Sequence, residues 1–216
     1  MPGPTPARLE RMRAAAAGRT RRLVLALEDV HKARNLGALL RTCDALGLQE
    51  VHAIENRSPA EEDGETSMGA GRWLDVVRHR RAGFPDPARL HPPAVAREPA
   101  ALDNSRRALA SLRARGYRLA VADLGPGALP LEDVPVDQPL AVVIGNEFTG
   151  ASPAALEMAD LRFGVPMRGF AQSLNLAVFA GIALHTLASR MRSHPGWPLA
   201  EAEQAELVAR WSSAQA

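Results

Sequence analysis

Short apolar runs alternate with amphipathic helical segments along this chain, and the alternation limits the fold more than any other feature. The run "RLVLALEDV" (residues 22–30) has the length of a buried strand, and "EVHAIE" (50–55) is a second one. Between them, apolar side chains recur at helical spacing from Leu36 to Leu46, and Gly47 closes the pattern. A strand, a helix and a second strand in this order predict a parallel pair.

The same alternation continues to the end of the chain. We expect further strands in "WLDVVRHR", "YRLAVADL", "PLAVVIGNE" and "LRFGVPM". We expect further helices over residues 7–19, in "LDNSRRALASLRARG" with Asp103 or Asn104 as its cap, in "SPAALEMAD", from 174 to 187, and in "PLAEAEQAELVARW". The sequence therefore predicts an α/β domain with an open, mainly parallel sheet and helices on both faces.

The most apolar helical segment has an unusual beginning. Residues 174 to 187 are nearly all apolar, which predicts a buried helix, yet Gln172, Ser173 and Asn175 stand at its start. These side chains can cap the backbone N–H groups of the first turn or can bind a ligand there, because both tasks use the same groups. Gly164, Pro166 and Gly169 precede them and permit close backbone crossings and a sharp turn.

Two further polar positions lie where parallel sheets bind ligands, beyond the carboxyl ends of strands. Asn35 follows the first strand, and Arg41 comes six residues later on a helix that is otherwise apolar in its middle. Such an arginine is either a surface residue that extends its head to water or a functional group. Glu147 directly follows an apolar strand in "VVIGNEFTG", where it is either a structural cap or a site residue.

Charge and cysteine usage restrict the setting of the protein. The net charge is only +2, but residues 8–22 contain six arginines against Glu10 alone, and residues 104–118 contain five arginines and no acid. These runs are either solvated helix faces or a surface for a polyanion. The one cysteine, Cys43, lies within an apolar helical pattern and is expected to be buried. With no apolar leader and no run long enough to span a membrane, the sequence predicts a cytoplasmic protein.

Several common site types have no support in the sequence. "GNEFTG" lacks the Lys-Ser/Thr of a phosphate loop, and no Gly-x-Gly-x-x-Gly follows the first strand. The six histidines show no spacing with acids or cysteine that suggests a metal site, so no metal is expected. No Gly-x-Ser-x-Gly elbow occurs.

Taken together, three segments resemble the three ordered motifs of the SpoU/TrmH family, the SpoU branch of the knotted (SPOUT) RNA methyltransferases. They are "LALEDVHKARNLGALLRTCDALGLQEVHAI", "VVIGNEFTGAS" and "VPMRGFAQSLNLAVFAGIAL". The subgroup that methylates the 2′-oxygen of guanosine 18 in tRNA is the most similar, and "TSMGAGRWLDVVRHR" resembles that subgroup as well.

The resemblance implies a fold, a cofactor and partners. It implies a deep trefoil knot in the C-terminal part of the parallel sheet, S-adenosyl-L-methionine held in the knot, tRNA as substrate, and a homodimer whose active site draws on both protomers. The implied division is a basic helical extension over 1–21, the methyltransferase domain over 22–192 with a proline-rich insertion at about 83–103, and a helical extension over 193–216.

Matching the family motifs residue by residue implies two sets of site residues, and the basic helix with its neighbours supplies the candidates for RNA binding. The implied catalytic residues are Asn35, Arg41, Glu147, Ser173 and Asn175. The implied cofactor contacts are Ala122, Leu124, Ile144, Gly145, Val165, Pro166, Met167, Ser173 and Leu174. The candidate RNA contacts are Arg8, Arg11, Arg13, Arg19, His31, Lys32, Arg34 and Arg168.

The family chemistry leaves the proton acceptor open. In the family the motif arginine, here Arg41, is placed against the 2′-hydroxyl and a phosphate. Because the pKa of arginine exceeds about 12, Arg41 either accepts the proton after unusual tuning or orients the phosphate and stabilises the alkoxide.

Three positions depart from the subgroup, with Arg168 for an apolar residue, Phe148 for lysine and Ala122 for a small hydroxyl residue. Two other functions remain open: methylation of another tRNA or rRNA nucleotide, and RNA binding without catalysis.

Overall fold

The alternation of strands and helices predicted from the sequence is present in the structure. The computed structural model describes residues 4–30, 32–57, 59–61, 63–83 and 98–213. The elements in chain order are α1 (Pro6–Ala17), β1 (Leu23–Glu28), α2 (Ala33–Leu46), β2 (Glu50–Glu55), α3 (Gly64–Ser67), η1 (Ala70–Trp73), β3 (Asp75–Arg80), α5 (Pro99–Ala114), β4 (Arg118–Ala122), β5 (Leu129–Pro130), η3 (Leu131–Asp133), β6 (Leu140–Ile144), α6 (Pro153–Met158), β7 (Leu161–Gly164), α7 (Leu176–Met191) and α8 (Glu201–Ser213).

One parallel sheet organises the described part of the chain. Its seven strands have the order β3-β2-β1-β6-β4-β7-β5, and every pair of neighbours is parallel. The prediction of a parallel α/β sheet is confirmed. The centre of the sheet joins strands far apart in sequence, since β1 pairs with β6 through Leu23↔Leu140 to Leu27↔Ile144.

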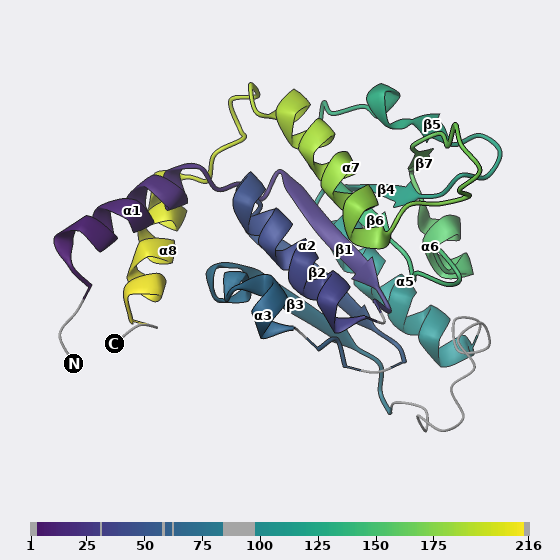
Figure 1. The fold of residues 1–216 in the computed structure, drawn as a ribbon, viewed down its shortest axis with the longest axis horizontal. Helices are drawn as coiled ribbons and strands as arrows, with labels where there is room; N and C mark the ends of the chain where they lie inside the picture. The colour runs from purple at the N-terminus through teal and green to yellow at the C-terminus, as the bar shows by residue number, and fades with distance from the viewer. Residues whose placement is uncertain (1–3, 31, 58, 62, 84–97, 214–216) are drawn as a thin grey trace.

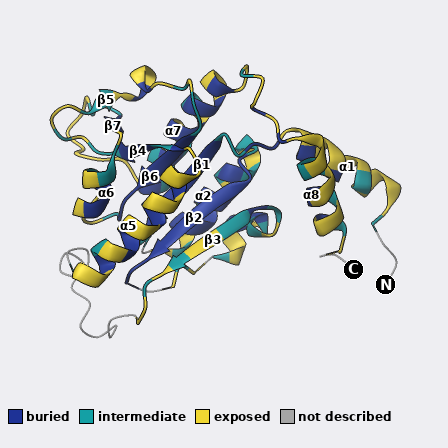
Figure 2. Ribbon diagram, turned by 180° about the vertical axis from the view of Figure 1, so that it is seen from behind, coloured by how far each residue is buried: buried dark blue, intermediate teal, exposed yellow. Residues whose placement is uncertain are grey.

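Helices cover both faces of this sheet, because its central strands are apolar on both sides. Along β1, Leu23, Leu25 and Leu27 belong to one hydrophobic cluster, whereas Val24 and Ala26 belong to another. The first cluster contains the apolar sides of α2 and α7, which lie side by side across the front of the sheet in Figure 1. The second contains those of α5 and α6, on the face turned toward the viewer in Figure 2.

Helix α2 begins and ends close to the predicted residues. Gly47 follows its last turn with a φ of 83°, and a Cβ at this position would lie 2.5 Å from the carbonyl oxygen of Gly18. Only glycine fits such a left-handed position against a neighbouring backbone. Cys43 is fully buried, and burial raises the pKa of its thiol to about 12, as expected for a structural cysteine.

Helix α5 begins earlier than predicted, so the expected cap at Asp103 or Asn104 is wrong. Its N-cap is Glu98, and Pro99 occupies the first helical turn, where a missing N–H costs nothing. The last five residues of the proline-rich stretch at 83–103 are therefore helical. Residues 84–97 of that stretch lie outside the described part of the chain.

Helices α1 and α8 pack on each other beside the sheet (Figures 1 and 2). Met12 and Ala16 of α1 form a small separate cluster with Leu199, Leu207 and Trp211. The helices predicted over 7–19 and near the C-terminus are thus confirmed. Among the helices described, none is long and apolar enough to cross a membrane.

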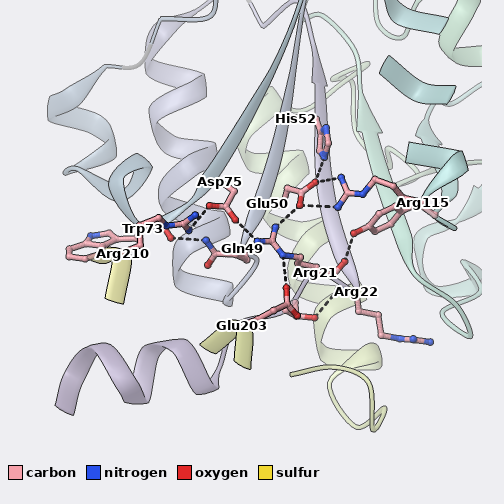
Figure 3. A network of polar contacts seen from close by, with 12 residues as sticks. Arg21, Arg22, Gln49, Glu50, His52, Trp73, Asp75, Arg115, Glu203 and Arg210 are labelled. Atoms are coloured by element: carbon pink, nitrogen blue, oxygen red, sulfur yellow. Dashed lines mark hydrogen bonds and ion pairs between the residues drawn. The ribbon is translucent and has the colours of Figure 1, made fainter. Parts of the chain in front are cut away.

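An ionic network fastens α8 to the amino ends of the strands (Figure 3). Arg21 pairs with Glu50 at 2.5 Å, with Asp75 at 2.5 Å and with Glu203 of α8 at 3.2 Å. Glu50 is buried, which by itself raises the pKa of its carboxyl, but hydrogen bonds from His52 and Arg115 outweigh burial and hold that pKa well below its usual range.

Candidate active site

A cavity of about 670 Å³ lies beyond the carboxyl ends of β1, β4, β6 and β7. Most of its lining comes from four segments that hold residues 122–124, 144–151, 163–165 with 167, and 173–176. This is the end of a parallel sheet at which such folds bind ligands. The volume falls within the range of roughly 300 to 1,000 Å³ that small-molecule sites occupy.

The structure joins three of the five predicted catalytic residues by hydrogen bonds. Asn35 donates from Nδ2 to Oε1 of Glu147 at 2.7 Å, and Asn175 donates from Nδ2 to Oδ1 of Asn35 at 3.4 Å. The backbone N–H of Lys32 donates to the same Glu147 oxygen at 3.3 Å. The Glu147 carboxylate is thereby held at the start of α2.

Two helix N-termini point toward the cavity. Lys32 is the N-cap of α2, and Asn175 is the N-cap of α7, where its Oδ1 accepts from the backbone N–H groups of Ala177 and Val178. Each N-terminus carries partial positive charge from the helix dipole and favours a negative group nearby. Glu147 already provides one such group at α2. The two dipoles therefore favour an anionic ligand or ligand group at the cavity.

Two glycines allow the backbone segments around the cavity to approach closely. A Cβ on Gly145 would lie 2.1 Å from the carbonyl oxygen of Gly150 and 2.2 Å from the nitrogen of Ala151. A Cβ on Gly164 would lie 2.4 Å from the side chain of Leu124. The carbonyl oxygen of Asp123 lies 3.1 Å from the same position, so Gly164 stands at a close approach between the ends of the paired strands β4 and β7. Gly169 lies at a bend of the chain, but nothing lies within 4 Å of a Cβ there and its φ is not positive.

The cavity gathers most of the predicted cofactor contacts. Its lining contains Ala122, Leu124, Ile144, Gly145, Val165, Met167, Ser173 and Leu174, but not Pro166. Ser173 precedes the helix instead of lying in its first turn, since α7 begins at Leu176.

Arg41 does not line the cavity. It is exposed on α2, six residues after Asn35. Six residues turn a helix by about 600°, so the two side chains point about 120° apart and lie about 9 Å apart along the axis. Arg41 is therefore directed away from the hydrogen bond that Asn35 makes with Glu147.

Helix α7 is buried on one side only, which corrects the prediction of a buried helix. Val178 and Ile182 are 52% and 41% exposed, whereas Leu184 and Leu187 on the other side are fully buried. α7 packs beside α2, so the exposed apolar side of α7 and the exposed Arg41 lie on the same face of the sheet (Figure 1).

Most of the candidate RNA contacts lie at the surface. Arg8, Arg11 and Arg13 are exposed on α1, and within the described residues none of the three makes an ion pair. The exposed candidates also include Lys32, Arg34 and Arg168. His31 lies outside the described residues.

Arg19 is the exception among these candidates. It is 4% exposed, pairs with Asp44, and donates from Nη1 to the carbonyl oxygen of Leu48 at 3.2 Å. Its guanidinium lies 5.4 Å from the ring centroid of Trp211. Because these contacts occupy it, Arg19 supports the fold, and its assignment to RNA binding is wrong.

The sequence reasoning missed polar residues that border the site. Asn146 and Asp123 line the cavity, and Asp29 directly follows β1 with a φ of 52°. Burial raises the pKa of the Asp29 carboxyl to about 6. The available signal was an aspartate directly after the first strand, because aspartate and asparagine tolerate a positive φ better than most residues. Among the described residues, no group of three or more His, Cys, Asp or Glu side chains could hold a metal ion.

Comparisons with known proteins agree with this geometry. The SpoU rRNA Methylase family matches residues 22–83 and 94–185. A tRNA (guanosine(18)-2′-O)-methyltransferase of Thermus thermophilus is 33% identical over 192 residues, which are 89% of this chain and 87% of that protein. The corresponding Borreliella burgdorferi enzyme is 30% identical over 190 residues, covering 88% of this chain and 77% of that protein.

A solved structure extends the similarity to the fold. The A. aeolicus TrmH/SpoU tRNA modifying enzyme has a TM-score of 0.76 at 26% identity, covering 97% of this chain and 96% of that one. Because the family match covers more than half of the chain and the sheet agrees with a solved family member, the chain belongs to the SpoU/TrmH family of methyltransferases.

Proposed function

We propose that this protein transfers a methyl group from S-adenosyl-L-methionine to the ribose 2′-oxygen of guanosine 18 in tRNA. The observation that carries the proposal is the cavity at the carboxyl end of the sheet, beside which Asn35, Glu147 and Asn175 form one hydrogen-bonded chain. The names of the two curated relatives supply the nucleotide. In the reaction the 2′-hydroxyl loses its proton, an O–CH₃ bond forms and the S–CH₃ bond breaks, which leaves S-adenosylhomocysteine.

The residues around the cavity fit the methyl donor. Ile144, Phe163 and Leu176 are apolar and suit a purine ring, and the buried glycines Gly145 and Gly164 have no room for a side chain. When bound, S-adenosylmethionine supplies an activated methyl group. The protein then contributes position, because a fixed distance between methyl carbon and nucleophile removes much of the entropic barrier.

We further propose that the active site is shared between two copies of the chain. The family resemblance implies that Arg41 acts beside the 2′-hydroxyl, yet Arg41 does not line the cavity of its own protomer. A second copy that covers Val178 and Ile182 of α7 would bring its Arg41 to the first copy's cavity, in an isologous interface. There Arg41 either accepts the proton or binds phosphate and stabilises the alkoxide. The match to the solved TrmH/SpoU structure over 97% of this chain supports the trefoil knot that we propose in this region.

Exposed arginines of α1 together with Lys32, Arg34 and Arg168 are proposed to bind the phosphates of the tRNA. Arg8, Arg11 and Arg13 carry charge that no described acid neutralises, which leaves it for phosphate groups. Since such contacts release counterions, the affinity for tRNA should fall steeply as the salt concentration rises.

Methyl transfer from labelled S-adenosylmethionine to a tRNA transcript tests the activity. Label should appear on guanosine 18, and a transcript that already carries 2′-O-methylguanosine at this position should accept none. Label elsewhere, or on an rRNA fragment alone, would assign another nucleotide. If calorimetry detects no binding of S-adenosylmethionine, the proposal is wrong, and RNA binding without catalysis becomes the alternative to test.

Co-expression of two inactive variants tests the shared site. Arg41→Ala and Glu147→Ala should each abolish turnover, and Arg41→Ala should still bind S-adenosylmethionine. In a mixed dimer one site carries both defects and the other carries none, so random pairing should restore about a quarter of the wild-type activity. A mixture that stays inactive would place Arg41 and Glu147 in the same protomer's site.

A further inference from the structure

The loop that carries Glu147 is closed on itself by backbone hydrogen bonds. The N–H of Asn146 donates to the carbonyl oxygen of Gly150 at 3.0 Å, and the N–H of Gly150 donates to the carbonyl oxygen of Asn146 at 2.9 Å. Gly150 has a φ of 68°, which allows the chain to turn there. The loop 146–150 is therefore a compact unit, and its attachment to the sheet determines where the Glu147 carboxylate lies.

The first attachment is the Asn146 side chain. Its Nδ2 donates to the carbonyl oxygen of Asp29 at 2.6 Å, and its Oδ1 accepts from the N–H of Phe148 at 2.8 Å. Asn146 is 7% exposed. The buried side-chain amide of Asn146 thus bonds to the residue after Glu147 and also ties the loop to the backbone just beyond β1.

The second attachment is Glu28, the last residue of β1. Its Oε2 accepts from the N–H of Ser152 at 2.9 Å, and its Oε1 accepts from the hydroxyl of Ser105 on α5. Glu28 is 3% exposed and forms no ion pair with any described residue. A buried carboxylate is costly unless hydrogen bonds satisfy it, so this one is tied to both donors.

The chain of hydrogen bonds continues behind Glu28. The amide of Asn56 donates to the hydroxyl oxygen of Ser105 at 3.0 Å, and the amide of Asn104 donates to Oδ1 of Asn56 at 2.8 Å. None of these side chains has a buried polar atom without a partner in the part of the chain that the structure describes. A buried network in which every group is satisfied specifies one arrangement of its members.

We propose that Asn146 and Glu28 are positioning residues, which act by holding the loop 146–150 so that Glu147 meets Asn35. The inference rests on the proposed function for its catalytic readout. Neither side chain makes the Glu147–Asn35 hydrogen bond itself; they fix the backbone on the two sides of it. Because a shift of about 1 Å near reacting groups costs about 100-fold in rate, loss of either attachment should lower kcat by about 10- to 100-fold.

Asn146→Ala and Glu28→Gln test the proposal, with Tyr117→Phe as the matched control. The control removes a hydrogen bond from Tyr117 Oη to the carbonyl oxygen of Arg21 at 2.8 Å, at the opposite end of the strands. All three variants should lose stability, but only Asn146→Ala and Glu28→Gln should lose kcat per folded molecule, with unchanged Kd for tRNA. An unchanged kcat in Asn146→Ala, or an equal loss in Tyr117→Phe, would overturn the proposal.

Amide hydrogen exchange separates this inference from the proposed function. In Asn146→Ala the amides of Phe148 and Gly150 should exchange faster, while that of Val142 in β6 should keep its wild-type protection. This readout requires no methyl transfer, so a wild-type protein that methylates no RNA would refute the function and leave the loop test standing. Loop amides that exchange at the wild-type rate in both variants would refute the positioning role.

Discussion

Replacing Asp29 by asparagine should stabilise this protein at neutral pH. Asp29 directly follows β1 with a φ of 52°, a left-handed conformation that asparagine adopts as readily as aspartate. Its Oδ1 accepts from the N–H groups of Asn56 at 2.7 Å and Arg57 at 3.0 Å. The amide oxygen of asparagine can accept the same two bonds, so Asp29→Asn removes a charge and keeps the geometry.

The magnitude follows from the pKa of this carboxyl. Burial, together with the nearby Glu28 charge, raises the pKa of Asp29 from 3.8 to about 6, although the two N–H donors oppose the shift. A difference of about 2 pKa units corresponds to about 3 kcal/mol, and partial solvent screening brings the expected effect to about 1 to 3 kcal/mol. Because the folded pKa is the higher one, the stability that protonated Asp29 contributes is complete below about pH 3.8 and is lost as the pH rises through about 6.

Urea unfolding of both proteins at several pH values measures this effect. The advantage of Asp29→Asn in free energy of unfolding should grow between about pH 4 and pH 6 and stay constant above about pH 6.5. Asp137→Asn is the control of opposite sign, because a hydrogen bond from Arg118 lowers the pKa of that exposed carboxyl. An advantage that is equal at pH 4.5 and pH 7.5, or a destabilised variant at pH 7.5, would refute the reasoning.

Three further predictions test the cavity, the RNA surface and the ionic network. Gly145→Ala should abolish binding of S-adenosylmethionine in calorimetry, because its Cβ would meet backbone at 2.1 Å, whereas Gly64→Ala, with nothing within 4 Å, should bind normally. Replacing Arg8 or Arg11 by glutamine should weaken tRNA binding in filter assays and reduce the salt slope by about 1 each. Glu50→Gln should lower the free energy of unfolding at pH 7 by about 3 to 5 kcal/mol. Since the folded pKa of Glu50 is depressed, this deficit should shrink in urea titrations as the pH falls below 4.5.

The elements that local patterns define were predictable from the sequence. The bounds of α2 follow from five apolar side chains at helical spacing and from Gly47, which adopts a φ of 83° at the predicted end. Helix α6 follows in the same way from Ser152, whose side chain caps the helix, and from Pro153 in the first turn. In each case the residues that decide the structure are neighbours in sequence.

Contacts between distant residues decided the features that were missed. β5 spans only Leu129–Pro130 and exists because β7 pairs with it, so no local pattern announces it. Arg19 continues the basic spacing of α1, but α1 ends at Ala17, and Asp44 and Leu48 draw the guanidinium inward. Nothing near Arg19 in the sequence indicates these partners.

The site itself combines both kinds of information. Asn35, Glu147 and Asn175 were identified because three motifs resemble a family in order, and the structure brings them together from positions more than a hundred residues apart. Asn146 stands in the same motif but was not singled out, because its importance lies in one hydrogen bond to the backbone of Asp29. A motif therefore predicts well which residues meet in the site. It predicts less well which residues hold them in place.

The uniform apolarity of residues 174–187 shows where sequence patterns are ambiguous. A helix that is apolar on every side predicts burial but does not say what buries it. Here the sheet covers Leu184 and Leu187, while Val178 and Ile182 remain exposed. The same face carries Arg41, which points about 120° away from Asn35 around the axis of α2. The second copy of the chain that we propose would account both for an arginine turned away from its cavity and for an apolar side that no described segment covers.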